Sequence, residues 1–180
     1  DDIMEALGLP EAQHAQFPQD ALRALSTRYY ERAMLRFEGF FATGEGYVCD
    51  GDIHTYSMNC NNLAIHYRYN EERYQDALNL HEKGLSSSPF AEHKSGAMSC
   101  LHGLQRYAEF IDAAEQLWHF AAEHGYGRHD PSQYFENVAW ALQSLDRYAE
   151  IEIWLDRLRE WVNSLDPDSL AEERPWLLGT

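Results

Sequence analysis

The phrase GLQRYAEF at residues 103–110 returns as SLDRYAEI at residues 144–151, and this near-repetition is the strongest indication of the fold. The likeness continues past the phrase, because apolar positions stay apolar while most polar positions differ. The matched pairs are Tyr107 with Tyr148, Phe110 with Ile151, Leu117 with Leu158, Phe120 with Trp161, and Ala121 with Val162. A repeat that keeps its apolar positions and varies the others is typical of an internal structural repeat.

Glycines and prolines divide the chain into segments that have the period of an amphipathic helix. We expect a helix over 19–41, followed by three helix pairs that are joined by short turns. The pairs occupy 54–86, 89–124 and 132–164, and the dipeptide ArgTyr opens the second helix of each pair. No stretch alternates for long with the period of two that a strand requires. The sequence therefore predicts an all-α fold, in which each pair buries its apolar face by stacking on its neighbours.

The first pair carries large, small and aromatic residues at regular positions in its two helices, and a proline follows the second helix. These residues are Leu63, Ala64, Tyr67, Tyr74, Ala77 and Pro89. In this pattern the pair resembles the tetratricopeptide repeat family. The later pairs depart from the pattern, because Met98, Phe110 and Ile151 stand where that family has small residues. The resemblance implies a right-handed helical-repeat array, a TPR-like α-solenoid, and the long second helices are similar to the kinesin-light-chain type.

The resemblance covers about residues 54–165 and divides the chain into three parts. Residues 1–50 are expected to form an N-terminal helical segment that packs on the array. Residues 51–165 are expected to hold the three helix pairs, and residues 166–180 to form a C-terminal tail or cap.

The resemblance also implies a concave groove, lined by the first helix of each pair, in which a peptide or helix of another protein binds. Asn62 and Asn137 fall at one repeat position, where the second pair has Gly96, and a carboxamide there can bond both N–H and C=O of a peptide. Alternatively these asparagines bond a neighbouring helix, and Trp140 suits the core as well as an anchoring role. The predicted partner-binding residues are Asn61, Asn62, Ile65, Arg68, Tyr69, Ser99, His102, Glu136, Asn137 and Trp140.

The chain is strongly acidic, with 30 acidic and 14 basic residues among 180 and a net charge of −16. This charge repels a phosphate backbone and attracts a basic protein, so we expect a protein partner and no nucleic acid. The first hypothesis is a non-catalytic interaction module or adaptor. The alternative is an acidic stoichiometric inhibitor, such as an immunity protein, or a secretion chaperone, in either case for a basic toxin or effector.

Motifs for catalysis are sparse. The chain has no Gly-x-Ser-x-Gly elbow, phosphate-binding loop or His-Glu-x-x-His motif. Asp50, Asp52, His54 and Cys60 offer oxygen, nitrogen and sulfur ligands, but their spacing matches no strong zinc pattern and Asp52 is expected to cap a helix. A metal-dependent enzyme is thus a third hypothesis, while our prediction is a protein with no catalytic residue, no bound metal and no cofactor.

The cysteines Cys49, Cys60 and Cys100 are few, odd in number and widely spaced, which favours free thiols in a reducing compartment. No run approaches the ~18 apolar residues of a membrane-spanning helix. The sequence therefore predicts a cytoplasmic protein without a membrane partner. No signal sequence opens the chain, although it begins at Asp1, so a segment trimmed from its start is also compatible with the sequence.

Overall fold

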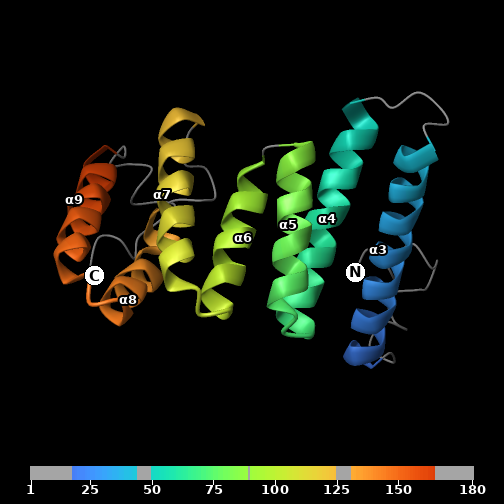
Figure 1. Ribbon diagram of the computed structural model, residues 1–180, viewed down its shortest axis with the longest axis horizontal. Coiled ribbons are helices and arrows are strands. Elements are labelled where there is room, and N and C mark those ends of the chain that lie inside the picture. Colours follow the sequence, from blue (N-terminus) through green and yellow to red (C-terminus); the bar gives the residue numbers. More distant parts are fainter. Residues whose placement is uncertain (1–17, 44–49, 89, 125–130, 165–180) are drawn as a thin grey trace, which may run out of the picture. The chain divides into compact units, whose positions relative to one another are not determined.

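The structure, a computed structural model, describes residues 18–43, 50–88, 90–124 and 131–164. Within these ranges it consists of seven α-helices and one short 3-10 helix, with no strand (Figure 1). The prediction of an all-α fold is therefore confirmed. The right-handed solenoid that the resemblance implies stays a prediction.

The described helices fall into two compact units, which divide after Gln105. The helices of the first unit are α3 (Gln19–Thr43), α4 (Asp50–Asn70), α5 (Tyr74–Ser87) and α6 (Ala91–Gly103). Helix α4 packs against α3, α5 and α6, and α5 also packs against α6. Asp52 lies inside the first turn of α4, which begins at Asp50, so the expectation that Asp52 caps this helix is wrong.

The second unit contains α7 (Tyr107–His124), the 3-10 helix η1 (Pro131–Gln133), α8 (Phe135–Ser144) and α9 (Tyr148–Ser164). Helix α8 packs against both α7 and α9. The helix expected over 132–144 is broken, because Tyr134 has a φ of −126° and separates η1 from α8. The Tyr134 side chain turns into the interior, where its ring centroid lies 6.3 Å from that of Trp154.

Each ArgTyr phrase lies at the turn between two consecutive helices, and the three turns share one backbone feature. The residue before the arginine has a positive φ, namely 53° at Glu72, 58° at Gln105 and 57° at Asp146. Each arginine then binds an acidic side chain three positions later. These ion pairs are Arg73–Asp76 at 2.8 Å, Arg106–Glu109 at 2.7 Å and Arg147–Glu150 at 2.6 Å. The repeated phrase therefore corresponds to a repeated turn.

A positive φ is costly for a residue with a Cβ, so Gln105→Gly is expected to raise the free energy of unfolding by about 1 kcal/mol. The left-handed region costs such residues about 1–2 kcal/mol, and the greater freedom of glycine in the unfolded chain offsets part of the gain. Urea denaturation followed by far-UV circular dichroism measures the change. Gln105→Ala keeps the Cβ and should stay within about 0.5 kcal/mol of the parent. A glycine variant no more stable than the alanine variant would contradict this account of the turn.

The tyrosine of the phrase contacts the helix that follows its own in two cases of three. Tyr74 lies so close to Gly103 of α6 that a Cβ there would come within 2.5 Å of the ring. Tyr107 meets Trp140 of α8 edge-on, with the ring centroids 4.9 Å apart. Tyr148 is 56% exposed, and α9 is the last helix that the structure describes. Tyr107 is thus a packing residue within its unit, whereas Tyr148 is mostly exposed.

A chain of polar side chains crosses the interior of the first unit. Ser57 Oγ on α4 lies 2.8 Å from His93 Nε2 on α6, and His93 Nδ1 lies 3.3 Å from His81 Nδ1 on α5. Each imidazole rests on a glycine of the facing helix. A Cβ added to Gly96 would lie 2.2 Å from the His81 ring, and one added to Gly84 would lie 2.1 Å from the His93 ring. Helices α5 and α6 therefore approach each other through two reciprocal histidine–glycine contacts.

Candidate functional site

One face of α4 presents large apolar side chains to solvent. Met58, Asn62, Ile65 and Tyr69 follow one another at steps of four, three and four residues, which places them on the same side of the helix. Met58, Ile65 and Tyr69 are 37%, 38% and 70% exposed, and Asn62 is half-buried. We call these four residues the α4 stripe. Exposed apolar side chains gathered on one face are typical of a binding surface.

The other predicted residues of the first unit lie close to this stripe in sequence or on α6, which packs against α4. The Arg68 guanidinium carbon lies 4.3 Å from the centroid of the Tyr69 ring, a cation–π geometry. Asn61 is buried, and His102 is half-buried. The Ser99 hydroxyl donates a hydrogen bond of 2.9 Å to a carbonyl of its own helix. Among the predicted residues of the first unit, Ile65 and Tyr69 are therefore the most accessible apolar ones.

The remaining three predicted residues lie on α8 in the second unit. Glu136 and Asn137 are exposed there. Trp140 is 48% exposed, and its other part contacts Tyr107 of α7. Trp140 thus combines the two roles between which the sequence could not decide, since it packs within its unit and still offers a surface. The ten predicted residues therefore form two groups, seven in the first unit and three in the second.

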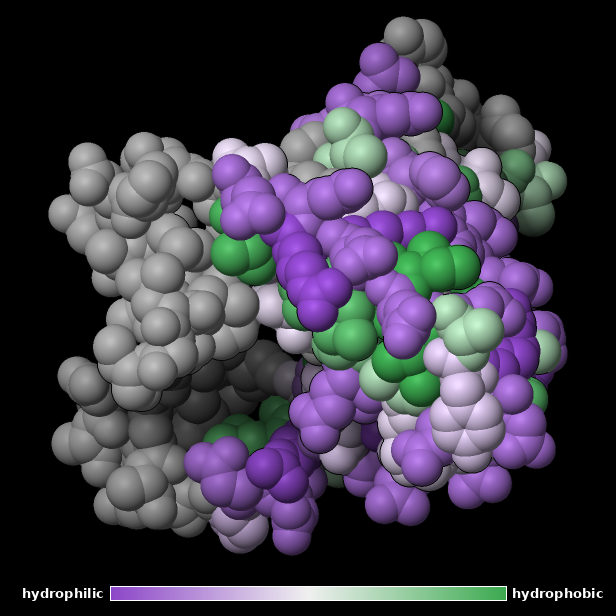
Figure 2. Space-filling view, turned by 90° about the vertical axis from the view of Figure 1, so that its left-hand side faces the viewer, coloured by the Kyte–Doolittle hydropathy of each residue, from purple (hydrophilic) through white to green (hydrophobic). Residues whose placement is uncertain are grey.

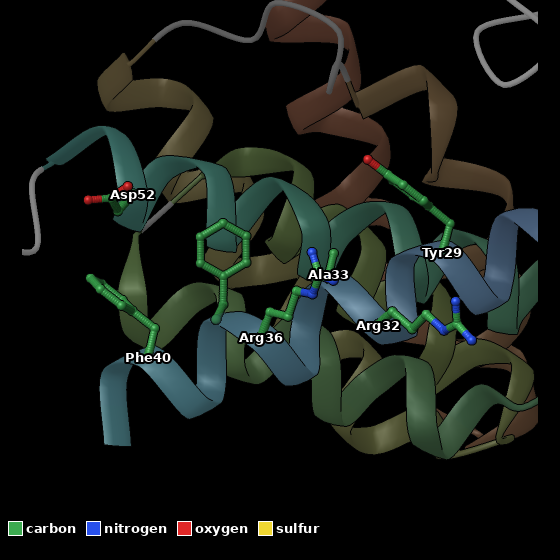
Figure 3. A pocket seen from close by; sticks show the side chains of 7 residues that line it. Tyr29, Arg32, Ala33, Arg36, Phe40 and Asp52 are labelled. Carbon is green, nitrogen blue, oxygen red and sulfur yellow. The ribbon is translucent and has the colours of Figure 1, made fainter. Parts of the chain in front are cut away.

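A cavity of about 480 Å³, in the size range of ligand pockets, runs along α3 (Figure 3). Its lining consists of Tyr29, Arg32, Ala33, Arg36, Phe37, Phe40 and Asp52. Six of these residues follow one another along α3 at alternating steps of three and one, so they form one face of that helix. The sequence predicts none of the six α3 residues as site residues, because it indicates only a packing role for the helix over 19–41. The available signal was the four-residue spacing of Arg28, Arg32 and Arg36 in an acidic chain.

The residues considered as metal ligands do not converge. Cys60 is fully buried with its Sγ 3.8 Å from Met34 Sδ, and burial raises the pKa of its thiol to about 11. His54 instead lies edge-on against Phe90, with ring centroids 5.1 Å apart. Within the described ranges, no three histidine, cysteine, aspartate or glutamate side chains gather closely enough to hold a metal ion.

Hydrophilic residues cover most of the described surface that faces the viewer in Figure 2, with small hydrophobic patches between them. No described helix is both long and apolar enough to cross a membrane. Compared with models of protein families, with curated proteins and with solved structures, the chain matches none. The tetratricopeptide resemblance therefore stays a prediction, and a function has to be inferred from the surfaces described above.

Proposed function

We propose that the chain is a non-catalytic protein-interaction module whose α4 stripe binds a peptide or a helix of a partner protein. The observation that supports this best is the exposure of Met58, Ile65 and Tyr69 on one face of α4. Binding becomes more favourable by about 25 cal/mol of free energy for each Å² of this apolar surface that a partner covers. A tyrosine adds a large rigid ring with few rotatable bonds, which is why tyrosines are common anchors at interfaces.

Asn62 lies in the middle of the stripe and suits the main chain of a bound peptide. Its carboxamide both donates and accepts, and it makes no hydrogen bond to another side chain within the described part of the protein. A peptide unit that lies across the stripe would satisfy this carboxamide while its side chains cover Ile65 and Tyr69. The proposed mode of binding is therefore apolar anchoring with one central polar clamp.

The proposal predicts that binding depends on the stripe. Peptides would be selected from a displayed random library on the immobilised full chain, synthesised, and measured by isothermal titration calorimetry. We expect Tyr69→Ala to weaken the affinity about tenfold or more, because loss of an aromatic anchor typically costs about 2 kcal/mol. Asn62→Ala should weaken it by a smaller factor, since a neutral hydrogen bond contributes about 1 kcal/mol.

The matched control is Ile153→Ala, which removes an exposed apolar side chain from α9 in the other unit. It should leave the affinity unchanged within about twofold. Selected peptides that bind the Tyr69→Ala and Asn62→Ala variants as tightly as the parent chain would refute a site at the stripe. A library that yields no binder would refute the peptide-binding function.

The charge of the chain supports a second candidate function, an acidic inhibitor or secretion chaperone of a basic protein. The described part of the second unit has ten acidic and four basic residues, and α7 has four acidic residues and no lysine or arginine. The negative electrostatic field of this surface accelerates association with a cationic partner, and salt screens that field. A basic partner whose association rate collapses with salt, and which binds the Tyr69→Ala variant normally, would favour this second function over the first.

A further inference from the structure

The outer face of α3 carries the opposite charge from the rest of the chain. This helix has four arginines and three acidic residues, and it is the only described helix in which lysines and arginines together outnumber aspartates and glutamates. Two of its acidic side chains turn toward neighbouring helices. Glu31 accepts a 2.8 Å hydrogen bond from the Tyr67 hydroxyl on α4, and Glu38 pairs with Lys83 Nζ on α5 at 2.7 Å. The opposite side of α3 is left with a surplus of positive charge.

Three arginines form a line along this side of α3. Arg28, Arg32 and Arg36 are spaced by four residues, are exposed, and make no ion pair with any described residue. Arg23, by contrast, lies 3.7 Å from Asp20. Like charges one helical turn apart destabilise a helix by about 0.2–0.5 kcal/mol per pair. The stability of the helix therefore does not account for this line of arginines.

The line of arginines borders the cavity on α3, since two of its three members line that cavity. Arg32 and Arg36 line it, and aromatic residues stand at its two ends (Figure 3). In that view Tyr29 lies at the end near Arg32, whereas Phe40 lies at the other end, near Asp52. Along the axis of α3, the positions of Tyr29 and Phe40 lie about 16 Å apart, because a helix rises about 1.5 Å per residue. An extended peptide spans this distance with about five residues.

We propose that the cavity binds an acidic segment of a partner protein that also carries an aromatic or large apolar side chain. A carboxylate of the segment pairs with Arg32 or Arg36, and guanidinium–carboxylate pairs are strong because two hydrogen bonds form in parallel. The apolar side chain lies against the aromatic residues of the lining. Asp52 repels a carboxylate at its own end of the cavity, so the acidic residue lies toward Tyr29.

The charge distribution favours a short acidic segment over an extended polyanion. A chain of net charge −16 repels nucleic acid and an anionic membrane, since both present many charges beyond the reach of the three arginines. At physiological salt, charges more than about 10 Å apart are largely screened, so a short segment experiences mainly the local positive field. This site lies on α3, apart from the α4 stripe. A failed test of this site therefore leaves the function proposed above intact, and the reverse also holds.

The test uses the full chain and three labelled short peptides, measured by fluorescence anisotropy at low salt. The first peptide alternates glutamate and phenylalanine, the second has lysine in place of glutamate, and the third has serine in place of phenylalanine. We expect the first peptide to bind at least tenfold more tightly than the other two. Its affinity should also fall as salt is added, because the ion pairs are partly exposed.

Two matched pairs of variants, all at exposed positions of α3, locate the binding. Arg36→Ser removes a charge from the cavity and Arg23→Ser removes one outside it. Tyr29→Ser and Leu35→Ser remove side chains that are 66% and 68% exposed, and only Tyr29 lines the cavity. We expect Arg36→Ser and Tyr29→Ser each to lower the affinity for the first peptide at least tenfold. Their two controls, and Tyr69→Ala on α4, should change its affinity less than twofold.

Four results would each overturn the proposal. They are a first peptide that does not bind, a lysine peptide that binds as tightly, equal affinities of Arg36→Ser and Arg23→Ser, and binding of phosphatidylserine vesicles or single-stranded RNA that depends on Arg36. Circular dichroism of every variant verifies that helix content is unchanged. A loss of peptide binding in Arg36→Ser therefore reports on the cavity and not on unfolding.

Discussion

Gly96→Ala is expected to lower the free energy of unfolding of the first unit by about 3 kcal/mol. The added Cβ would lie 2.2 Å from the His81 ring, far inside van der Waals contact. This ring is 1% exposed, so the overlap lies inside the core and not at the surface. Overpacking of a core typically costs about 1–3 kcal/mol, and displacement of the ring also breaks its contact with His93, at about 1 kcal/mol.

The measurement has to distinguish the two units, because they need not unfold together. All tryptophans in the described ranges lie in the second unit, so their fluorescence reports on that unit alone. Amide hydrogen exchange of α5 and α6 under native conditions reports on the first. Gly39→Ala is the matched control, since its added Cβ would have no heavy atom within 4 Å apart from its chain neighbours and the backbone of its own helix. It should stabilise α3 by about 0.5–1 kcal/mol.

A second substitution tests whether the steric overlap is the cause. In a His81→Ala background the ring is gone, so Gly96→Ala should cost much less than it does in the parent chain. Because the two residues are in contact, the two changes should be strongly non-additive. Gly84→Ala, whose Cβ would lie 2.1 Å from the His93 ring, should likewise cost much less in a His93→Ala background than in the parent chain. Additive effects, or a Gly96→Ala variant as stable as Gly39→Ala, would contradict the close approach of α5 and α6.

The sequence predicts those parts of the fold that depend on neighbouring residues. The helices follow from apolar periodicity, and the ArgTyr turns follow from a phrase that repeats the same local backbone at Glu72, Gln105 and Asp146. The contact of Gly96 with His81 could not be predicted in this way. It joins residues on different helices, and the repeat pattern instead grouped Gly96 with the predicted groove position of Asn62. Contacts between distant residues leave no periodic signal in one sequence.

The candidate sites show the same division. Ile65 and Tyr69 were predicted from their positions in a repeat, and both are exposed on one face of α4. The cavity on α3 was missed although Arg32 and Arg36 carry a local signal, the four-residue spacing of like charges. That signal gains a meaning only when Glu31 and Glu38 are known to turn toward α4 and α5. The direction of a side chain around a helix decides the charge of each face, and composition alone does not provide it.

The buried histidines should also make the first unit sensitive to mild acid. Burial, the neighbouring His93 and the charge of Arg68 together hold the pKa of His81 down to about 3, and burial also lowers the pKa of His93. Arg68 faces His81 from α4 and His93 faces it from α6, while Glu92 acts on His93 in the opposite direction. His81 Nε2 has no hydrogen-bond partner among the described residues, so a proton there would gain no acceptor.

The sign of the effect follows from proton binding in the two states. Below its ordinary pKa of about 6.5, His81 takes up a proton in the unfolded chain but stays neutral in the folded unit until about pH 3. The stability is therefore complete above pH 6.5 and falls by about 1.4 kcal/mol for each pH unit below it. Between pH 7.5 and 5.0, His81 alone should cost the first unit about 2 kcal/mol, and His93 should add to this loss.

Hydrogen exchange of α5 and α6 across this pH range, corrected for the intrinsic rate, measures the slope in the parent chain and in His81→Gln. We expect the variant to lose part of the slope, while the remainder comes from His93 and His66, whose pKa values burial also lowers. His119→Gln, on the exposed side of α7, should keep the whole slope. The carboxylates with lowered pKa, Glu109 and Glu150, act below pH 4.5 and so do not contribute in this window. Equal slopes in the parent and His81→Gln would mean that His81 already carries its proton in the folded unit. The chain through Ser57 and His93 would then have to stabilise a buried charge.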